Sequence, residues 1–310
     1  MVWKLEDLPE ETLALAANNG LGVPLFLKLV QEAGRFECIG PALLENTLDD
    51  VLPKGVSELL RTTVCNTDVR RIKEAAISNK ITFVSVLDDE YPKLLKPLPA
   101  PPPIIWYRGS LESVHRAAVA IVGARRCTAY GIRQTQHFAS MICEAGVGVI
   151  SGGARGIDGV AHRTAATLGS TNVVVLGSGL DVIYPPEHAA LFDHVVEHGG
   201  LLLSEFSCTT TPKPAHFPRR NRIVAGLASS VLVVEAANRS GALITARIAV
   251  EEHGREAFVI PGRVDDPASR GCLRIAQEGW AQLALEPQIV IEETIEAYAR
   301  LIRSNCEVLQ

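Results

Sequence analysis

Several short apolar runs in this sequence are followed by glycine and arginine, a combination that can bind anions. Glycine lets the backbone approach a ligand closely, and a helix that begins next offers free N–H groups at a positive dipole end. Arginine adds a bidentate donor. The candidate residues on the loops after these runs are Gly123, Arg125, Arg126, Gly152, Gly153, Arg155, Ser240 and Gly241. We therefore predict a row of anion sites along one edge of a sheet.

A proline-bearing segment between residues 212 and 222 adds an aromatic side chain to the same chemistry. Its candidate binding residues are Lys213, Phe217, Arg219, Arg220, Asn221 and Arg222. An aromatic ring beside guanidinium groups suits single-stranded nucleic acid, because a base stacks on the ring while the phosphates are held. Phe217 could instead anchor the loop in the core, and Asn221 could hold loops together.

The charge distribution favours a polyanionic ligand only in the middle of the chain. The 310 residues carry a net charge of −5. Residues 119–275, however, hold 15 basic and 13 acidic side chains, and 14 of those basic residues are arginine. Arginine holds phosphate through a planar fork that lysine lacks. A row of such sites suits a sugar–phosphate backbone, which repeats its charge at every nucleotide.

Motifs for other kinds of chemistry are missing. No G-x-x-x-x-G-K-[ST] occurs, and no G-x-G-x-x-G follows the first apolar run, which disfavours Walker-type ATPases and dehydrogenases. No G-x-S-x-G elbow or metal-ligand spacing stands out either. Asp158 and His162 are spaced to share a helix face, and we interpret them as a helix-orienting contact. The sequence thus predicts a binding protein with no cofactor, no metal and no catalytic residues.

The apolar runs also predict the fold that positions these residues. They are almost continuously apolar and alternate with helical stretches, which is typical of parallel strands covered on both faces. The predicted strands are residues 118–123, 147–151, 172–177, 201–205, 230–236 and 256–261. We therefore predict an α/β fold with a Rossmann-like, doubly wound, mostly parallel sheet. Ligands of such sheets bind at the carboxyl ends of the strands, where the candidate residues lie.

Three further units surround this sheet. Residues 1–80 predict a small all-helical module, and residues 81–118 predict a proline-rich connector that packs on the core and holds two strand-like stretches. The sheet domain then spans residues 119–287, and residues 288–310 predict a C-terminal helix and tail. Five apolar residues near that boundary could form a dimer surface or complete the core: Leu283, Leu285, Ile289, Val290 and Ile291.

Composition predicts a cytoplasmic location. The chain has no run of about 18 apolar residues and begins with an acidic stretch, so neither a transmembrane helix nor a secretory signal is expected. Its seven cysteines include no C-x-x-C pair, which fits free thiols in a reducing compartment.

Long motifs in the chain resemble the DNA-processing protein A family (DprA, also called Smf). They include IVGARRCTAYG at 121–131, SGGARGIDGVAHRTA at 151–165 and HFPRRNRIVAGL at 216–227. Further matches follow in order from about residue 85 to 285, so no single short pattern carries the resemblance. The first 80 residues are similar only in being a small helical module of the sterile-alpha-motif (SAM-like) kind.

The resemblance implies a non-enzymatic protein that binds single-stranded DNA. Members of the family protect incoming DNA during natural transformation, help to load the RecA recombinase, act with single-strand-binding protein and form homodimers. The resemblance also implies a phosphate pocket, with Phe217 and Lys213 beside it. Carried onto this chain, the pocket consists of Gly123, Arg125, Gly152, Gly153, Arg155, Asn221, Arg222, Ser240 and Gly241.

Two departures from the family pattern and two alternative functions accompany this expectation. Ala124 stands where Ser is common, and Leu273 stands where Asn is usual, which could alter one end of the pocket. A nucleotide phosphoribohydrolase is one alternative, although SGGARGID replaces its P-G-G-x-G-T-x-x-E signature. A protein adaptor that binds no DNA is the other, favoured by the acidic N-terminal module and the C-terminal helix.

Overall fold

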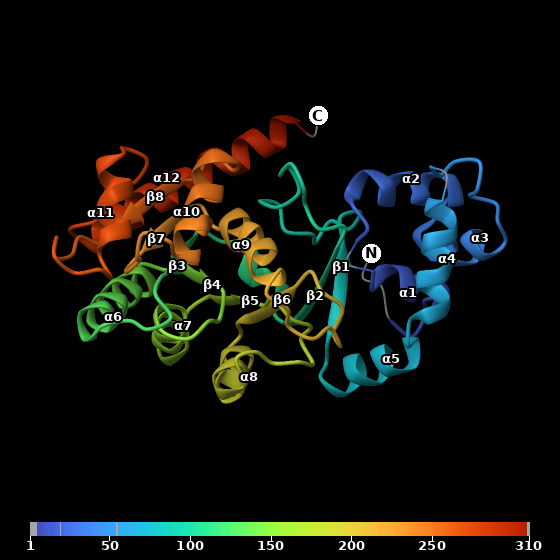
Figure 1. Ribbon diagram of the computed structural model, residues 1–310, viewed down its shortest axis with the longest axis horizontal. Helices are drawn as coiled ribbons and strands as arrows, with labels where there is room; N and C mark the ends of the chain where they lie inside the picture. Colours follow the sequence, from blue (N-terminus) through green and yellow to red (C-terminus); the bar gives the residue numbers. More distant parts are fainter. Residues whose placement is uncertain (1–4, 19, 54, 309–310) are drawn as a thin grey trace.

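The computed structural model of the chain describes residues 5–18, 20–53 and 55–308, and it shows one sheet with helices on both faces and a helical module at one end (Figure 1). The α-helices are α1 (Glu10–Ala16), α2 (Val23–Ala33), α3 (Ile39–Leu44), α4 (Val56–Asn66), α5 (Val69–Ser78), α6 (Ala129–Glu144), α7 (Ile157–Thr167), α8 (Ala189–Glu197), α9 (His216–Leu227), α10 (Gly241–Glu251), α11 (Arg270–Gln277) and α12 (Pro287–Val308). The strands are β1 (Thr82–Ser85), β2 (Ile104–Gly109), β3 (Ala118–Val122), β4 (Gly148–Ser151), β5 (Asn172–Val175), β6 (Leu201–Ser204), β7 (Ser230–Val233), β8 (Glu256–Val259) and β9 (Gln282–Leu283).

The strand order of the sheet confirms the predicted Rossmann-like topology. Within the described residues the order is β1-β2-β6-β5-β4-β3-β7-β8-β9. The strands from β6 to β9 in this order are parallel, whereas β2 pairs antiparallel with both β1 and β6. Strands β4, β5 and β6 are added on one side of β3, and strands β7, β8 and β9 on the other side, so the strand order reverses between β3 and β7. In a doubly wound sheet this switch point opens a crevice at the carboxyl ends of the strands.

Alternate residues of β3 pack into two different cores, because successive side chains of a strand point to opposite faces. Val119 and Ile121 pack in a core that includes residues of α6, α7 and α12. Ala118, Ala120 and Val122 pack in a larger core that includes residues of α9 and α10. Both faces of the central strands are therefore buried, which explains why their sequences are continuously apolar.

The N-terminal helices share the larger core with the sheet. A chain of rings runs from α2 to β2: Phe26 and Phe36 have centroids 5.7 Å apart, Phe36 and Phe83 6.1 Å, and Phe83 and Trp106 5.5 Å. Strand β1 lies between the N-terminal helices and the remaining strands (Figure 1). The two connector strands thus extend the sheet and present an apolar face on which the helical module packs.

The five apolar residues near the start of α12 divide between core and surface. Val290 and Ile291 are buried, so they complete the core beneath α12. Leu283, Leu285 and Ile289 are 45%, 73% and 40% exposed. The sequence had left a core role and a dimer-surface role open. The structure places Val290 and Ile291 in the core and leaves the other three side chains partly exposed.

Two expectations about the chain as a whole can be compared with the structure. None of the helices in the described ranges combines the length and the apolar character needed to cross a bilayer. No disulfide joins the cysteines whose side chains the structure describes, which are Cys38, Cys65, Cys127, Cys143, Cys208 and Cys272.

Candidate functional site

A hollow of about 600 Å³ lies at the topological switch point, and we call it the switch-point hollow. Its walls come from the segments that follow β3, β4 and β7, together with the first turns of α9 and α10. Eight predicted site residues line it: Gly123, Arg125, Gly152, Phe217, Arg220, Asn221, Ser240 and Gly241. Residues from loops more than 100 positions apart therefore meet, as expected for the carboxyl edge of a parallel sheet.

Arg220 places a buried cation in the wall of this hollow. Arg220 is 5% exposed, and its Nη1 donates a hydrogen bond of 2.6 Å to the carbonyl of Val175. Its Nε is buried and makes no hydrogen bond, and no carboxylate of the described residues lies within ion-pair distance. Burial lowers the pKa of Arg220 to about 10, which still leaves it charged at neutral pH. The charge of Asp158 compensates this cation only from beyond ion-pair distance, and an incompletely paired buried cation is costly, so this position favours an anionic ligand.

Gly152 has no side chain because Arg220 occupies the space that one would fill. A Cβ at this position would lie 1.9 Å from Nη1 of Arg220. The N–H of Gly152 also donates to Asp158 at 3.2 Å, and that of Ala154 donates at 3.3 Å. Burial raises the pKa of Asp158, while Arg220 and these donors oppose the shift. The glycine turn thus holds the buried arginine and the carboxylate in fixed places.

Arg125 and Phe217 form the exposed side of the hollow. The Arg125 guanidinium carbon lies 5.5 Å from the ring centroid of Phe217, within the range of a cation–π contact. Arg125 is exposed, and none of its carboxylate neighbours among the described residues is close enough for an ion pair. The ring of Tyr184 lies 5.5 Å from that of Phe217. Phe217 is therefore a half-buried ring between a free cation and a second aromatic, and it is not packed into the core.

The N-terminus of α10 forms another wall. Ser240 caps this helix by accepting a hydrogen bond of 3.3 Å from the N–H of Ala242. A Cβ added to Gly241 would meet no atom within 4 Å, so the backbone here is open to an approaching ligand. Asn221 donates weakly to the Gly241 carbonyl at 3.5 Å and links α9 to α10, in line with its expected structural role.

Arg155 lies next to the switch-point hollow, where it lines a smaller adjoining cavity with Arg125 and Phe217. Its guanidinium is paired with Glu187 through Nε, and Nη2 donates to the same carboxylate at 3.0 Å. That hydrogen-bonded carboxylate raises the pKa of Arg155. The pair is half exposed and bidentate, so Arg155 has a carboxylate partner that Arg125 lacks among the described residues.

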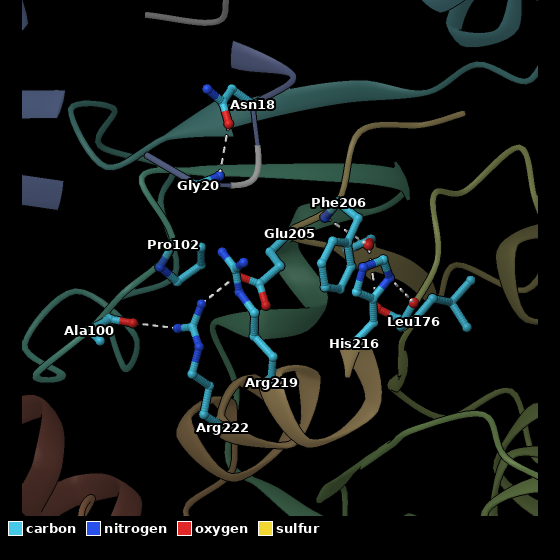
Figure 2. A network of polar contacts seen from close by, with 12 residues as sticks. Asn18, Gly20, Ala100, Pro102, Leu176, Glu205, Phe206, His216, Arg219 and Arg222 are labelled. Carbon is cyan, nitrogen blue, oxygen red and sulfur yellow. Dashed lines mark hydrogen bonds and ion pairs between the residues drawn. The ribbon is translucent and has the colours of Figure 1, made fainter. Parts of the chain in front are cut away.

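Arg219 and Arg222 occupy a different environment, which we call the Glu205 cluster (Figure 2). The Glu205 side chain is 2% exposed; it pairs with Arg219 at 3.1 Å and also with Arg222. Arg222 donates in addition to the carbonyl of Ala100 in the connector. These two arginines line neither cavity described above. The sequence grouped them with Arg220, and the structure separates them because a buried carboxylate holds them on another side of α9.

Three more candidates lie outside the switch-point hollow. Gly153 has φ 65°, and a Cβ there would lie 2.8 Å from both Phe192 and Val174, so this glycine serves the core. Arg126 and Lys213 are exposed but line no cavity of this edge. The six arginines that were expected along one rim are therefore divided. Arg125 and Arg220 line the hollow, Arg155 lies beside it, and Arg126, Arg219 and Arg222 lie elsewhere.

Some residues of the site were not predicted, and two expectations need correction. Tyr184 and Asp158 line the hollow, yet the sequence had indicated neither as a ligand contact. His162 does not pair with Asp158; its Nδ1 lies 2.6 Å from Oδ1 of Asn172 in the core. Leu273 lines neither this hollow nor its smaller neighbour, so the departure at that position lies outside the pocket.

The described residues include one set of side chains with metal-ligand spacing. His194, Glu197 and His198, near the end of α8, have ligand atoms within 4.8 Å of one another. None of the three lines the switch-point hollow. The chemistry of the hollow is therefore that of arginine, backbone N–H groups and an aromatic ring.

Comparison with known proteins agrees with this combination of fold and site. The family described as DNA recombination-mediator protein A matches residues 82–295. The chain belongs to this family. The match covers the whole sheet and both connector strands, and it includes every residue of the switch-point hollow.

Individual relatives of the family are similar over the same region. Protein Smf of Escherichia coli (strain K12) is 43% identical over 202 residues, which are 65% of this chain and 54% of the relative. The chain thus spans about half the length of that relative.

Two solved structures of the family are also similar. The X-ray structure of DprA from Streptococcus pneumoniae has a TM-score of 0.77 at 33% identity, covering 94% of this chain and 99% of the other. DNA processing protein A from Helicobacter pylori, whose structure concerns its single-stranded DNA binding mode, has a TM-score of 0.62 at 28% identity, covering 70% and 97%.

Proposed function

We propose that this protein binds single-stranded DNA in the switch-point hollow and so protects incoming strands during natural transformation. The observation that carries the proposal is the pair of arginines, buried Arg220 and exposed Arg125, that line one hollow with no carboxylate of the described residues within ion-pair distance. Phosphate groups are the anions that such a pair, together with a capped helix N-terminus, binds well.

The aromatic residues explain why we propose a single strand. Phe217 is half buried at the mouth of the hollow, with Tyr184 and Arg125 on its sides. A base can stack on such a ring only when it is free of its complement. The name of the Helicobacter pylori relative, which refers to single-stranded DNA binding, supports the same ligand class.

An enzymatic role finds less support in the lining of the hollow. Asp158 is its only carboxylate among the described residues, and two backbone N–H groups already bind it. The chain also has SGGARGID where phosphoribohydrolases carry P-G-G-x-G-T-x-x-E, with Arg and Asp in place of the Thr and Glu of that signature. We therefore propose a binding protein, and not a phosphoribohydrolase.

The partners belong to the same proposal. We propose that the bound strand is passed to the RecA recombinase in the cytoplasm, with single-strand-binding protein as a further partner. A homodimer would cover the exposed apolar side chains Leu283, Leu285 and Ile289 at the edge of the sheet. The curated relatives named for DNA processing support this role, and the free thiols are compatible with a reducing compartment.

The deciding experiment is a salt-dependent titration of labelled single-stranded and duplex DNA. We expect wild type to prefer the single strand and to lose affinity as salt rises, because bound arginines release counterions from the phosphates. Arg125→Ala should weaken binding about tenfold and reduce the salt slope by about 1. Arg126→Ala is the matched control, since its side chain is exposed but lines no hollow of this edge. A flat salt response, or equal affinity for duplex, would contradict the proposal.

A further inference from the structure

A second hollow, of about 570 Å³, lies beside the first. Ser240, Gly241 and Ile244 line both, so only the first turn of α10 separates the two. We call it the tryptophan hollow, because Trp280 is among its lining residues. The sequence had assigned no ligand contact to four of its lining residues: Arg239 before α10, Arg247 on α10, Arg274 on α11 and Trp280 after α11.

The tryptophan hollow repeats the chemistry of the first one with other residues. Arg239, Arg247 and Arg274 line it together with Trp280. Trp280 is partly exposed, and its Nε1 donates a hydrogen bond of 2.8 Å to Glu278, which fixes one edge of the indole. A fixed indole next to guanidinium groups is a stacking surface for an unpaired base, with donors nearby for its phosphates.

The charges of this hollow leave a net positive balance. Glu251 pairs with Arg247 at 2.8 Å, and Glu278 pairs with Arg274 at 3.7 Å, both across one turn of a helix. All four side chains are about half exposed or more, so these pairs are weak and can open for a phosphate. Arg239 is exposed and has no ion pair among the described residues. Three arginines thus face two carboxylates.

We propose that a bound single strand continues from the switch-point hollow across the first turn of α10 and places a further nucleotide in the tryptophan hollow. The small residues Ser240 and Gly241 form the ridge between the two, and no atom stands within 4 Å of the Gly241 Cβ position. A backbone can therefore cross the ridge closely and meet Arg239 on the other side. This second subsite rests on the proposed function, because it receives the strand that the first hollow holds.

A length series of oligothymidylates tests the second subsite. Short strands of about four nucleotides can fill only one hollow, whereas strands of about twelve can reach both. Arg239→Glu should weaken the binding of the long strand about tenfold and leave that of the short strand within twofold. Arg70→Glu, on α5 of the helical module, is the control because it makes the same charge change at another exposed arginine, one that lines neither hollow. Equal effects of Arg239→Glu at both lengths, or no effect at either, would overturn the inference.

Tryptophan fluorescence supplies a readout that does not depend on a destabilising variant. Trp106 is fully buried, so quenching by DNA should come from Trp280 once Trp3 is replaced by Phe. Long strands should quench this signal and short strands should not, and Trp280→Phe should abolish the length-dependent part. Quenching by thymidine monophosphate alone would make this an independent nucleotide site and would overturn the continuous path.

The failure of this inference can be told apart from failure of the proposed function. If Arg125→Ala weakens binding at every length while neither Arg239→Glu nor Trp280 fluorescence depends on length, the first hollow binds DNA and the second does not. If Arg125→Ala has no effect at any length, the proposed function itself fails.

Discussion

Arg219 and Arg220 are neighbours in the sequence, at the start of the same helix, yet they belong to two regions with opposite electrostatics. Arg219 shares the buried carboxylate of Glu205 with Arg222 (Figure 2). Arg220 is buried beside Gly152. The carboxylate of Asp158 lies beyond ion-pair distance but is close enough to counteract the lowering of the Arg220 pKa by burial. One region has satisfied its cations internally, whereas the other keeps a cation for a ligand.

The difference shows that an arginine-rich motif need not have a single role. The Glu205 cluster connects α9 to the end of β6 and, through Arg222, to the connector. It therefore positions α9 against the sheet. That position decides where Arg220, one residue from Arg219, enters the hollow. We interpret the cluster as the support and the hollow as the ligand site.

The largest expected effect is on stability, and it concerns Glu205. Glu205→Ala should lower the free energy of unfolding by about 3 kcal/mol, because it leaves two arginines without their buried partner. This is the low end of the usual range, since both guanidiniums keep some exposure to water. Urea unfolding measures the loss, with Glu205→Gln as a milder control. A loss below about 0.5 kcal/mol would show that the cluster does not support the fold.

Gly152→Ala should affect both stability and binding. The added methyl group overlaps the Arg220 guanidinium, and overpacking of this kind costs about 2 kcal/mol. We expect DNA affinity to fall as well, because Arg220 must move. In an Arg220→Ala background the same methyl group should cost little, and a double-mutant cycle measures this coupling. Additive effects would contradict the close approach.

Phe217→Ala should weaken single-strand binding by about 1.5 kcal/mol through lost stacking. Phe217→Leu keeps most of the apolar volume but removes the ring, so it should lose nearly as much affinity while remaining close to wild type in stability. Titration with single-stranded DNA, together with thermal unfolding, separates the two roles. If Phe217→Leu binds like wild type, the side chain packs the loop and does not stack on a base.

The smallest effect is expected for Arg219→Ala. Its side chain is 41% exposed and lines neither cavity, and Arg222 still pairs with the buried Glu205 when Arg219 is removed. Affinity for single-stranded DNA should stay within twofold of wild type, in contrast to the tenfold loss expected for Arg125→Ala. A loss as large as that of Arg125→Ala would erase the distinction between the two regions.

Much of the fold could be predicted from local patterns. The run AVAIV of β3 is apolar at every position, and in β7 only the first residue, Ser230, is polar, because both faces of these strands are covered. The turns that follow place ligand-binding groups at the carboxyl ends of the strands. The helical stretches were predicted by their apolar periodicity. The antiparallel pairing of β2 with β6 was not predicted, because it depends on contacts between residues about 100 positions apart.

The sequence predicted the candidate site residues from their types and their positions after strands. The structure separated the arginines that form ion pairs with carboxylates from those that do not. Local sequence determined which residues follow the strands, so Gly123, Arg125 and Gly152 could be predicted as site residues without any knowledge of tertiary contacts. Whether an arginine stays free depends on carboxylates from elsewhere in the chain: Glu205 follows β6, and Glu187 precedes α8. Ion pairing is set by distance in space, and only the packing of α8 and α9 on the sheet fixed that distance.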